Sequence, residues 1–250
     1  MSKKKINCEN CTKSFGSKQI LKHYKTCLAE KYKEYAGHYV VSFYGYGTFG
    51  AFHYMFAIVN PETTFATIDQ FLKDKWLACC GHLSTFEYDG KRISSQAIFR
   101  TYADKKIVYE YDMGSSTVVY IEDSLLIESD VAPTKSTYIL PVLRNKPIQY
   151  GCYVCEGLST HYDGNGKFLC DTHEKDTTAD PEWRRIIINS PRMGESCFSG
   201  EELRDDKTYE KNVTNKRGFP EEFFVDDDEF MPPIPLQIQH GGDDPSDDDV

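Results

Sequence analysis

The stretch from Tyr39 to Val59, YVVSFYGYGTFGAFHYMFAIV, decides the fold because it contains two strands joined by a glycine-rich turn. Residues 39–44 and 52–59 are rich in β-branched and aromatic side chains, which favour strands. Three glycines lie in residues 45–50 and permit a tight turn, and Pro61 ends the second strand. The stretch therefore predicts a β-hairpin.

A helix is expected after this hairpin. Thr67-Ile68-Asp69-Gln70 matches a capping box, with Thr67 at the N-cap and Gln70 at the third helical position. Apolar residues then recur at three- and four-residue spacing, which gives the helix one face to bury, and Gly81 ends it. These apolar residues are Ile68, Phe71, Leu72 and Trp76.

Further strands are expected at residues 84–88, 107–112, 117–122 and 138–143. Two of them form a hairpin in which Asp112 accepts hydrogen bonds from turn amides and Gly114 supplies a positive φ. Pro141 places the last strand at a sheet edge, because proline has no amide hydrogen to donate. Long-range strands with one main helix predict an α+β domain over residues 38–147, with a mixed or antiparallel sheet.

A cluster of cysteine and histidine precedes the hairpin, Cys8-x2-Cys11-x11-His23-x3-Cys27. Two close ligand pairs that an intervening segment brings together are what tetrahedral Zn²⁺ needs. Ser17 can cap a helix over residues 18–33, where the four-residue spacing puts His23 and Cys27 on one face. The segment resembles Cys-Cys-His-Cys zinc fingers, so we expect a finger over residues 1–33 with one structural zinc.

A second cluster, Cys152-x2-Cys155-x14-Cys170-x2-His173, follows the predicted α+β domain. Gly157 lets the chain turn back under a metal, as in a zinc knuckle. The turn Asp163-Gly164-Asn165-Gly166 then returns the chain to the second ligand pair, as in a zinc ribbon. Four protein ligands close a zinc shell, so this ion is also expected to be structural. We therefore expect a zinc-knuckle module over residues 148–200 and two Zn²⁺ ions in the chain.

Charge is unevenly distributed along the chain, whose net charge is −10. Residues 1–35 hold nine lysines and three glutamates, whereas residues 201–250 hold sixteen acidic and five basic residues. This acidic tail has little to bury, so we expect it to be largely disordered. Its aromatic residues either bind a partner, shield a basic surface or dock on the protein itself. They are Phe223, Phe224 and Phe230.

The cellular compartment follows from the cysteines and from the hydropathy of the chain. No apolar run approaches the ~20 residues of a membrane-spanning helix. Paired cysteines without a secretion signal favour metal binding in a reducing compartment. We expect a cytoplasmic protein, or a nuclear one if the host is eukaryotic. We expect neither a membrane nor a nucleotide cofactor among its partners.

Two segments in the predicted α+β domain carry a family resemblance, Trp76–Phe86 (WLACCGHLSTF) and Tyr109–Ser116 (YEYDMGSS). They resemble the family named for open reading frame three of the Ri plasmid, also called insertion-element passenger proteins. In that family a helix is followed by His-Leu-x-x-Phe and later by Tyr-Asp-Phe-Gly-Asp-Ser. Here Met113 stands for Phe and Ser115 for Asp. The resemblance covers roughly residues 38–145 and implies an α+β fold, but no activity.

Several polar residues near these segments have two readings. His82 is typical of a core or capping histidine after a helix, and the alternative is a catalytic pair with Asp112, although no spacing rule links the two. The thiols of Cys79 and Cys80 are typical of buried cysteines. A further metal or redox site formed by Cys79, Cys80, His82 and Cys197 stays open.

The segment Asn189–Gly194 (NSPRMG) and the zinc knuckle look like a branch of uncharacterised bacterial and archaeal proteins. Within this segment, Arg192 follows Ser-Pro. Its guanidinium either binds a phosphate or carboxylate group or forms a salt bridge to the acidic remainder of the chain.

Together these features predict a zinc-stabilised binding or adaptor protein without catalytic activity. Phosphate contact by the finger helix favours nucleic acid as the partner, while overall acidity and the absence of arginine from that helix favour protein. The lysines that would contact phosphate are Lys18, Lys22 and Lys25. The alternative is a hydrolase or nuclease whose site in the α+β domain uses Asp112, His82 or His53.

Overall fold

A computed structural model describes residues 6–8, 10–15, 17–47, 49–78, 80–130, 138–195, 198–201 and 203. These residues belong to one compact unit, which spans residues 1–215. Nearly all of the predicted acidic tail lies outside them, so its disorder stays a prediction. Within the described ranges, the helices are all too short or too polar to cross a membrane.

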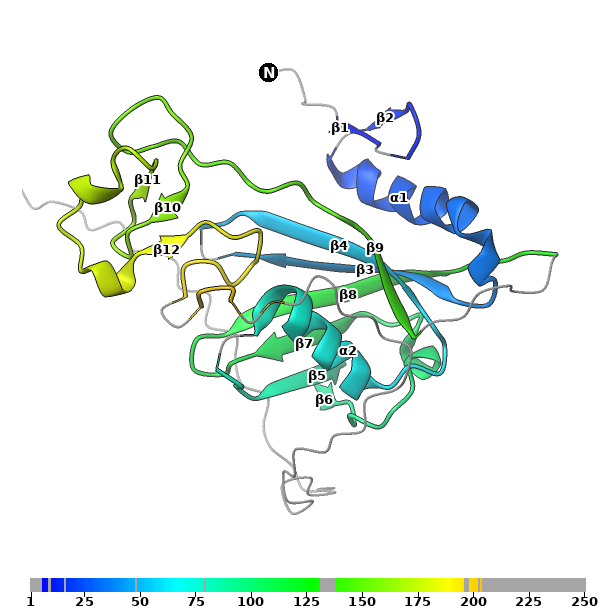
Figure 1. The fold of residues 1–250 in the computed structure, drawn as a ribbon. Coiled ribbons are helices and arrows are strands. Elements are labelled where there is room, and N and C mark those ends of the chain that lie inside the picture. The colour runs from blue at the N-terminus through cyan, green and yellow to red at the C-terminus, as the bar shows by residue number, and fades with distance from the viewer. Residues whose placement is uncertain are drawn as a thin grey trace, which may run out of the picture. The chain divides into compact units, whose positions relative to one another are not determined.

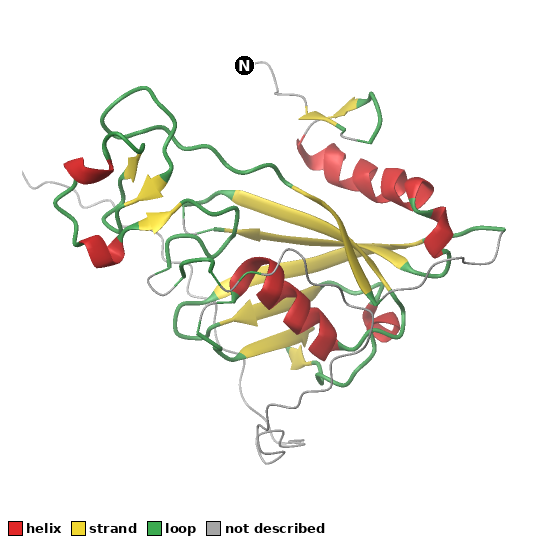
Figure 2. Ribbon diagram, viewed as in Figure 1, coloured by secondary structure: helices red, strands yellow, loops and turns green. Residues whose placement is uncertain are grey.

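Seven strands form the central sheet in the order β6-β5-β7-β8-β3-β4-β9, and every neighbouring pair is antiparallel (Figures 1 and 2). The predicted hairpin lies inside this sheet and is paired along its whole length, from Tyr39 opposite Val59 to Tyr46 opposite Phe52. The strands are β3 (Tyr39–Tyr46), β4 (Phe52–Val59), β5 (Ser84–Tyr88), β6 (Lys91–Arg92), β7 (Ile107–Tyr111), β8 (Thr117–Leu126) and β9 (Ile139–Arg144). This architecture confirms the predicted α+β class.

The predicted strands are all present; β4 and β5 have the predicted ends, and the ends of the others are shifted. β9 is the edge strand expected from Pro141, which pairs with Ala57 beside an irregularity in the register. β8 continues to Leu126 because its second half pairs with the start of β3. The short β6 was not predicted, since two residues carry no periodic signal.

Helix α2 (Phe65–Leu72) continues into a π-helical turn, η2 (Lys73–Leu77), and the two pack on one face of the sheet (Figure 1). The apolar face predicted for this helix is fully buried there, in a core with Phe43, Tyr109 and Val119. A 3-10 helix, η3 (Phe99–Tyr102), adds Phe99 to the same core.

Both predicted ends of this helix are wrong. The N-cap is Thr64, whose side chain accepts a hydrogen bond from the amide of Thr67. Thr67 is already inside the first turn, and its buried hydroxyl lies 3.0 Å from that of Thr64. At the other end the backbone turns extended at Ala78, so Gly81 lies in the following loop and caps nothing.

The N-terminal module packs on the opposite face of the sheet. It consists of β1 (Ile6–Asn7), β2 (Ser14–Phe15), α1 (Ser17–Lys31) and the 3-10 turn η1 (Lys33–Tyr35). α1 buries Ile20, Tyr24 and Leu28 against side chains of β3 and β4 (Figure 1). Because side chains alternate along a strand, Val40 faces α1 while Val41 faces α2.

The C-terminal module has a separate small sheet in the order β11-β10-β12. Its strands are β10 (His161–Tyr162), β11 (Phe168–Leu169) and β12 (Arg185–Ile186), with 3-10 helices η4 (Glu174–Asp176) and η5 (Pro181–Trp183). Phe49, in the β3–β4 turn, contacts this module, with its ring centroid 4.9 Å from those of Tyr162 and Phe168.

The chain then returns to the central sheet. The hydroxyl of Ser190 donates to the carbonyl of Trp76 at 2.6 Å. The side-chain amide of Asn145 donates to Oδ1 of Asn189, and that of Asn189 donates to the backbone carbonyl of Asn145. Pro191 lies against the β3–β4 hairpin, where a Cβ on Gly47 would stand 3.1 Å from its carbonyl oxygen. The segment 189–192 therefore anchors the C-terminal module to the sheet.

Candidate metal centres and the clusters around them

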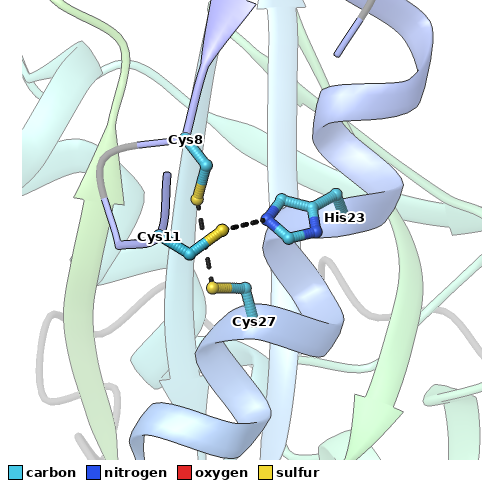
Figure 3. A group of neighbouring side chains, drawn as sticks. All are labelled: Cys8, Cys11, His23 and Cys27. Carbon is cyan, nitrogen blue, oxygen red and sulfur yellow. Dashed lines mark hydrogen bonds between the residues drawn. The ribbon is translucent and has the colours of Figure 1, made fainter. Parts of the chain in front are cut away.

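Cys8, Cys11, His23 and Cys27 converge in the finger (Figure 3). The Sγ atom of Cys11 lies 3.3 Å from Nε2 of His23, and the Sγ atoms of Cys8 and Cys27 are 3.9 Å apart. All four ligand atoms lie within 4.8 Å of one another. A tetrahedral ion with metal–sulfur bonds of about 2.3 Å and metal–nitrogen bonds of about 2.0 Å separates its ligand atoms by roughly 3.5–3.8 Å. The cluster therefore fits a tetrahedral metal site.

Local structure fixes both ligand pairs of this first cluster. The amide of Cys8 donates to the carbonyl of Lys13 at 2.9 Å and closes the β1–β2 hairpin around the first pair. Helix α1 presents His23 and Cys27 one turn apart, as the spacing predicted. The ring of Phe15 stacks on the His23 imidazole with centroids 4.1 Å apart, which holds the imidazole with Nε2 towards Cys11.

The thiols of the first cluster need a cation to ionise together. Burial raises the pKa of Cys27 to about 11, and the neighbouring thiols of Cys8 and Cys11 add to the rise. Burial lowers the pKa of His23, which keeps its imidazole neutral, as a metal ligand must be. A divalent ion at the centre would stabilise the thiolates, so the donor set suits a metal.

Cys152, Cys155, Cys170 and His173 form a second cluster of the same kind. Nδ1 of His173 lies 3.7 Å from Sγ of Cys152 and 3.2 Å from Sγ of Cys170, and the Sγ atoms of Cys155 and Cys170 are 3.9 Å apart. These ligand atoms also lie within 4.8 Å of one another. The distances again fit a tetrahedral ion. His173 would bind this ion through Nδ1, whereas His23 presents Nε2 to the first site.

Two turns build the second cluster as predicted. The amide of Gly157 donates to Sγ of Cys155 at 3.4 Å, and a Cβ at this position would stand 3.3 Å from the same sulfur. The β10–β11 turn is held by Asp163, whose Oδ1 accepts from the amides of Asn165 and Lys167 at 2.8 and 3.0 Å. The turn adopts the positive φ that glycine permits, 81° at Gly164.

Hydrogen bonds favour the thiolate form of two ligands in the second cluster, Cys152 and Cys170. Burial acts to raise the pKa of Cys152, but hydrogen bonds from the amides of Cys170, Val154 and Cys155 outweigh it and lower this pKa to about 6. Hydrogen bonds to Cys170 and Cys152 raise the pKa of His173. Each of the two clusters thus supplies three cysteines and one histidine, compatible with two metal sites that leave no coordination position open.

The three finger lysines proposed for phosphate contact are all on α1, and the two whose side chains are described differ in exposure. Lys22 is exposed on α1, and Lys25 is half-buried on the same helix. The side chain of Lys18 lies outside the described residues. Lys22 also lines an open hollow of about 460 Å³ with Phe15, Gln19, His23 and Thr26.

His82 and Asp112, which no sequence spacing links, lie together, with Nδ1 of His82 3.5 Å from Oδ1 of Asp112. Arg192 completes this cluster. Its guanidinium is fully buried and donates to Oδ2 of Asp112, to the carbonyl of Ser115 at 2.9 Å and to Oγ1 of Thr117 at 3.0 Å. Arg192 therefore forms a salt bridge within the protein, and its partner is Asp112 in the β7–β8 turn rather than a residue of the acidic tail.

Asp112 holds the β7–β8 turn in place. Its Oδ1 accepts from the amide of Gly114 at 3.2 Å, which confirms its predicted turn role. The positive φ falls on Asp112 itself, at 61°, so its prediction at Gly114 is wrong. Burial acts to raise the pKa of Asp112, but hydrogen bonds from Arg192 and from the amides of Gly114 and Ser115 hold it below its usual range.

The other residues predicted for a site in the α+β domain are not found in one cluster with His82, Asp112 and Arg192 among the described residues. His53 is buried on β4, and burial lowers its pKa to about 4, so its imidazole is neutral. Cys80 is exposed, while Cys79 and Cys197 lie outside the described residues. The further site proposed for these cysteines with His82 therefore stays a prediction.

A surface that sequence reasoning missed lies on the same side of the sheet as α1. We call it the aromatic face; it consists of Tyr44, Tyr46, Phe52, Tyr54 and Tyr120. Ring centroids of neighbours lie 5.3 Å apart for Tyr44 and Tyr120 and 5.8 Å apart for Tyr44 and Phe52. Tyr46 is 61% exposed, and the other four rings are half-buried. Alternation of aromatic residues at 44, 46, 52 and 54 was the sequence signal for it.

Comparison with known proteins leaves the chain without a family. No protein-family model matches it, and no curated protein matches it either. The likeness to the Ri-plasmid family therefore remains a resemblance. One similar solved structure is the crystal structure of MM3350, a protein of unknown function from Methanosarcina mazei Go1. It is 18% identical over 43% of this chain and 68% of that chain, with a TM-score of 0.34, which supports no conclusion about fold or function.

Proposed function

We propose that the protein is a zinc-stabilised binding protein without catalytic activity, and that its partner is a protein. The observation that carries the proposal is the pair of closed clusters, each with three cysteines and one histidine. Thiolate and imidazole ligands in tetrahedral arrangement are the donor set of structural Zn²⁺. Because four protein ligands leave no position for water or substrate, each zinc would stabilise its module and take no part in a reaction.

The distribution of charge favours a protein partner over nucleic acid. Phosphate binding draws on several cations that are free to pair. On the finger, however, Lys33 pairs with Glu30 at 2.6 Å, and Lys31 donates to Asn10 at 2.9 Å. Two carboxylates, Glu110 and Glu122, lie beside the aromatic face and repel phosphate. Exposed aromatic side chains are instead typical of protein interfaces.

Two measurements test the proposal. Elemental analysis of the purified full chain is expected to give two zinc ions per chain. Anisotropy of labelled single- and double-stranded DNA and RNA across a salt series is expected to show no binding at low salt. Fewer than two zinc ions would remove the structural role of the metals. Salt-dependent binding that weakens in a Lys22→Ala, Lys25→Ala variant would show that the partner is a nucleic acid and not a protein.

The contact between His82 and Asp112 supports a second candidate, a hydrolase, because a carboxylate can orient a histidine that acts as a general base. The variant Asp112→Asn separates the two functions. In a binding protein it destabilises the fold, since Arg192 loses its buried partner. In a hydrolase the same loss of stability is accompanied by complete loss of turnover of a generic ester or phosphodiester substrate, measured on the folded protein.

A further inference from the structure

We infer that the aromatic face binds an extended, arginine-bearing segment of a partner protein. This inference rests on the proposed function and deepens it, because it names the surface and the chemistry of the partner. In the described part of the chain, α1 covers one end of this side of the sheet, over Val40, Phe56 and Ile58, and leaves Tyr46 61% exposed at the other end. The contact between Tyr24 of α1 and Tyr54, 6.2 Å between centroids, marks where that cover ends.

The register of the strands aligns the rings across the sheet. Tyr120 on β8 is directly opposite Tyr44 on β3, which is opposite Tyr54 on β4. Phe52 and Tyr46 form the next row, with centroids 5.3 Å apart. Strands lie about 4.8 Å apart, so an extended segment that crosses three strands meets several rings in succession.

Carboxylates lie on both sides of this row of rings. Glu122 is two residues from Tyr120 on the same strand and therefore on the same face, and Glu110 on β7 is opposite Val118, diagonal to Tyr120. The cation paired with Glu122 is the 79% exposed Lys106, at 3.5 Å, which a partner can displace. Burial and a hydrogen bond to Glu122 raise the pKa of Tyr44, so its hydroxyl stays protonated and uncharged.

Aromatic rings flanked by carboxylates match the chemistry of arginine. A guanidinium stacks on the face of a ring and donates two parallel hydrogen bonds to a carboxylate. Phosphates of a nucleic acid that stacked its bases on the same rings would lie near Glu110 and Glu122 and be repelled. The surface therefore favours a cationic peptide over a single-stranded nucleic acid.

The test uses the full chain and a fluorescein-labelled peptide of alternating arginine and glycine. The matched probe has citrulline in place of every arginine, which removes the charge and keeps the shape. Anisotropy is measured for the natural chain, for Tyr46→Ala and for Glu110→Gln. The control variants are Trp183→Ala, a 52% exposed ring, and Glu128→Gln, an exposed carboxylate. The acidic tail contributes the same background to all of them.

We expect Tyr46→Ala and Glu110→Gln each to weaken arginine-peptide binding about two- to five-fold, the effect of an exposed cation–π contact. The controls should leave it unchanged, and the citrulline peptide should bind no variant. Crosslinks from a photoreactive arginine peptide should map to β3, β7 or β8.

Equal binding of the citrulline peptide, equal effects of the controls, or crosslinks confined to the tail would overturn the inference. Competition by oligothymidylate that depends on Tyr46 would assign the face to nucleic acid. Failure here would leave two zinc ions per chain untouched, so it is distinguishable from failure of the proposed function.

Discussion

The finger and the C-terminal module hold the same donor set, yet they are built into the protein in different ways. In the finger, helix α1 buries Ile20, Tyr24 and Leu28 against the central sheet, in a cluster that extends to Val40, Phe56 and Ile58. In the C-terminal module, the described residues form two-residue strands and three-residue 3-10 helices. Its buried apolar side chains, such as Leu169 beside Cys170, lie next to the ligands themselves.

This difference indicates what each metal would do. In the finger, the sheet already stabilises the helix, so the ion would order only the β1–β2 hairpin against it. In the C-terminal module no helix packs on a large apolar surface, and small modules of this kind depend on a metal for their fold. Two sites with identical ligands are therefore expected to differ in how much structure is lost with the ion.

The largest expected effect is the loss of the second metal. Cys155→Ser should remove the ion and abolish protection from hydrogen exchange over residues 150–187, because apparent binding free energies of structural zinc are about 10–16 kcal/mol. Cys11→Ser should expose only the amides of the β1–β2 hairpin and leave α1 protected. Hydrogen exchange with mass spectrometry measures both. Equal loss of protection in α1 and in residues 150–187 would contradict the comparison.

A smaller effect is expected at the anchor between the C-terminal module and the sheet. Arg192→Met leaves the carboxylate of Asp112 without its cation, and breaking a buried ion pair costs about 3–5 kcal/mol. Urea unfolding should show this loss while the chain retains two zinc ions. Arg185→Met is the matched control, since half-buried Arg185 donates to the backbone carbonyl of Arg184 at 2.8 Å. A similar loss in both variants would mean that Arg192 is no special anchor.

The contrast between the modules also shows what sequence reasoning can reach. Ligand sets and the 39–59 hairpin are local patterns, so spacing and alternation predicted them. The contact between Arg192 and Asp112 joins residues 80 positions apart and leaves no periodic trace. The capping box of Thr67 and Gln70 predicted the cap three residues too late, since Thr64 offers the same hydroxyl one turn earlier. At the true start of the helix the backbone pairs with residues 95–98, a contact that no local pattern specifies. The aromatic face depends on where α1 docks, which a single sequence does not specify.

The finger interface should respond to mutation independently of its metal. Leu28→Ala removes a fully buried side chain between α1 and the sheet and should cost about 2–5 kcal/mol. Zinc content should stay at two ions per chain, because Leu28 supplies no ligand atom to the cluster. Leu21→Ala, at a half-buried position on the same helix, should cost less. Loss of the finger zinc in the Leu28 variant would show that docking and metal binding are one event, which would remove the distinction between the two modules.

The smallest expected effect concerns the turn that closes the second site. The Asp163 carboxylate accepts hydrogen bonds from Thr177 at 2.7 Å and from two amides. Asp163→Asn keeps the shape of the side chain but removes its charge, so the free energy of unfolding of the module should fall by about 1–2 kcal/mol at neutral pH. Burial acts to raise the pKa of Asp163, but these hydrogen bonds hold it below its usual range. The folded state therefore favours the ionised form, and its contribution is complete above about pH 4 and lost as the pH falls further. Paired unfolding curves for the natural chain and the variant should converge below that pH. A difference that persists there would assign the effect to shape rather than charge, and the second module would then depend on its metal alone.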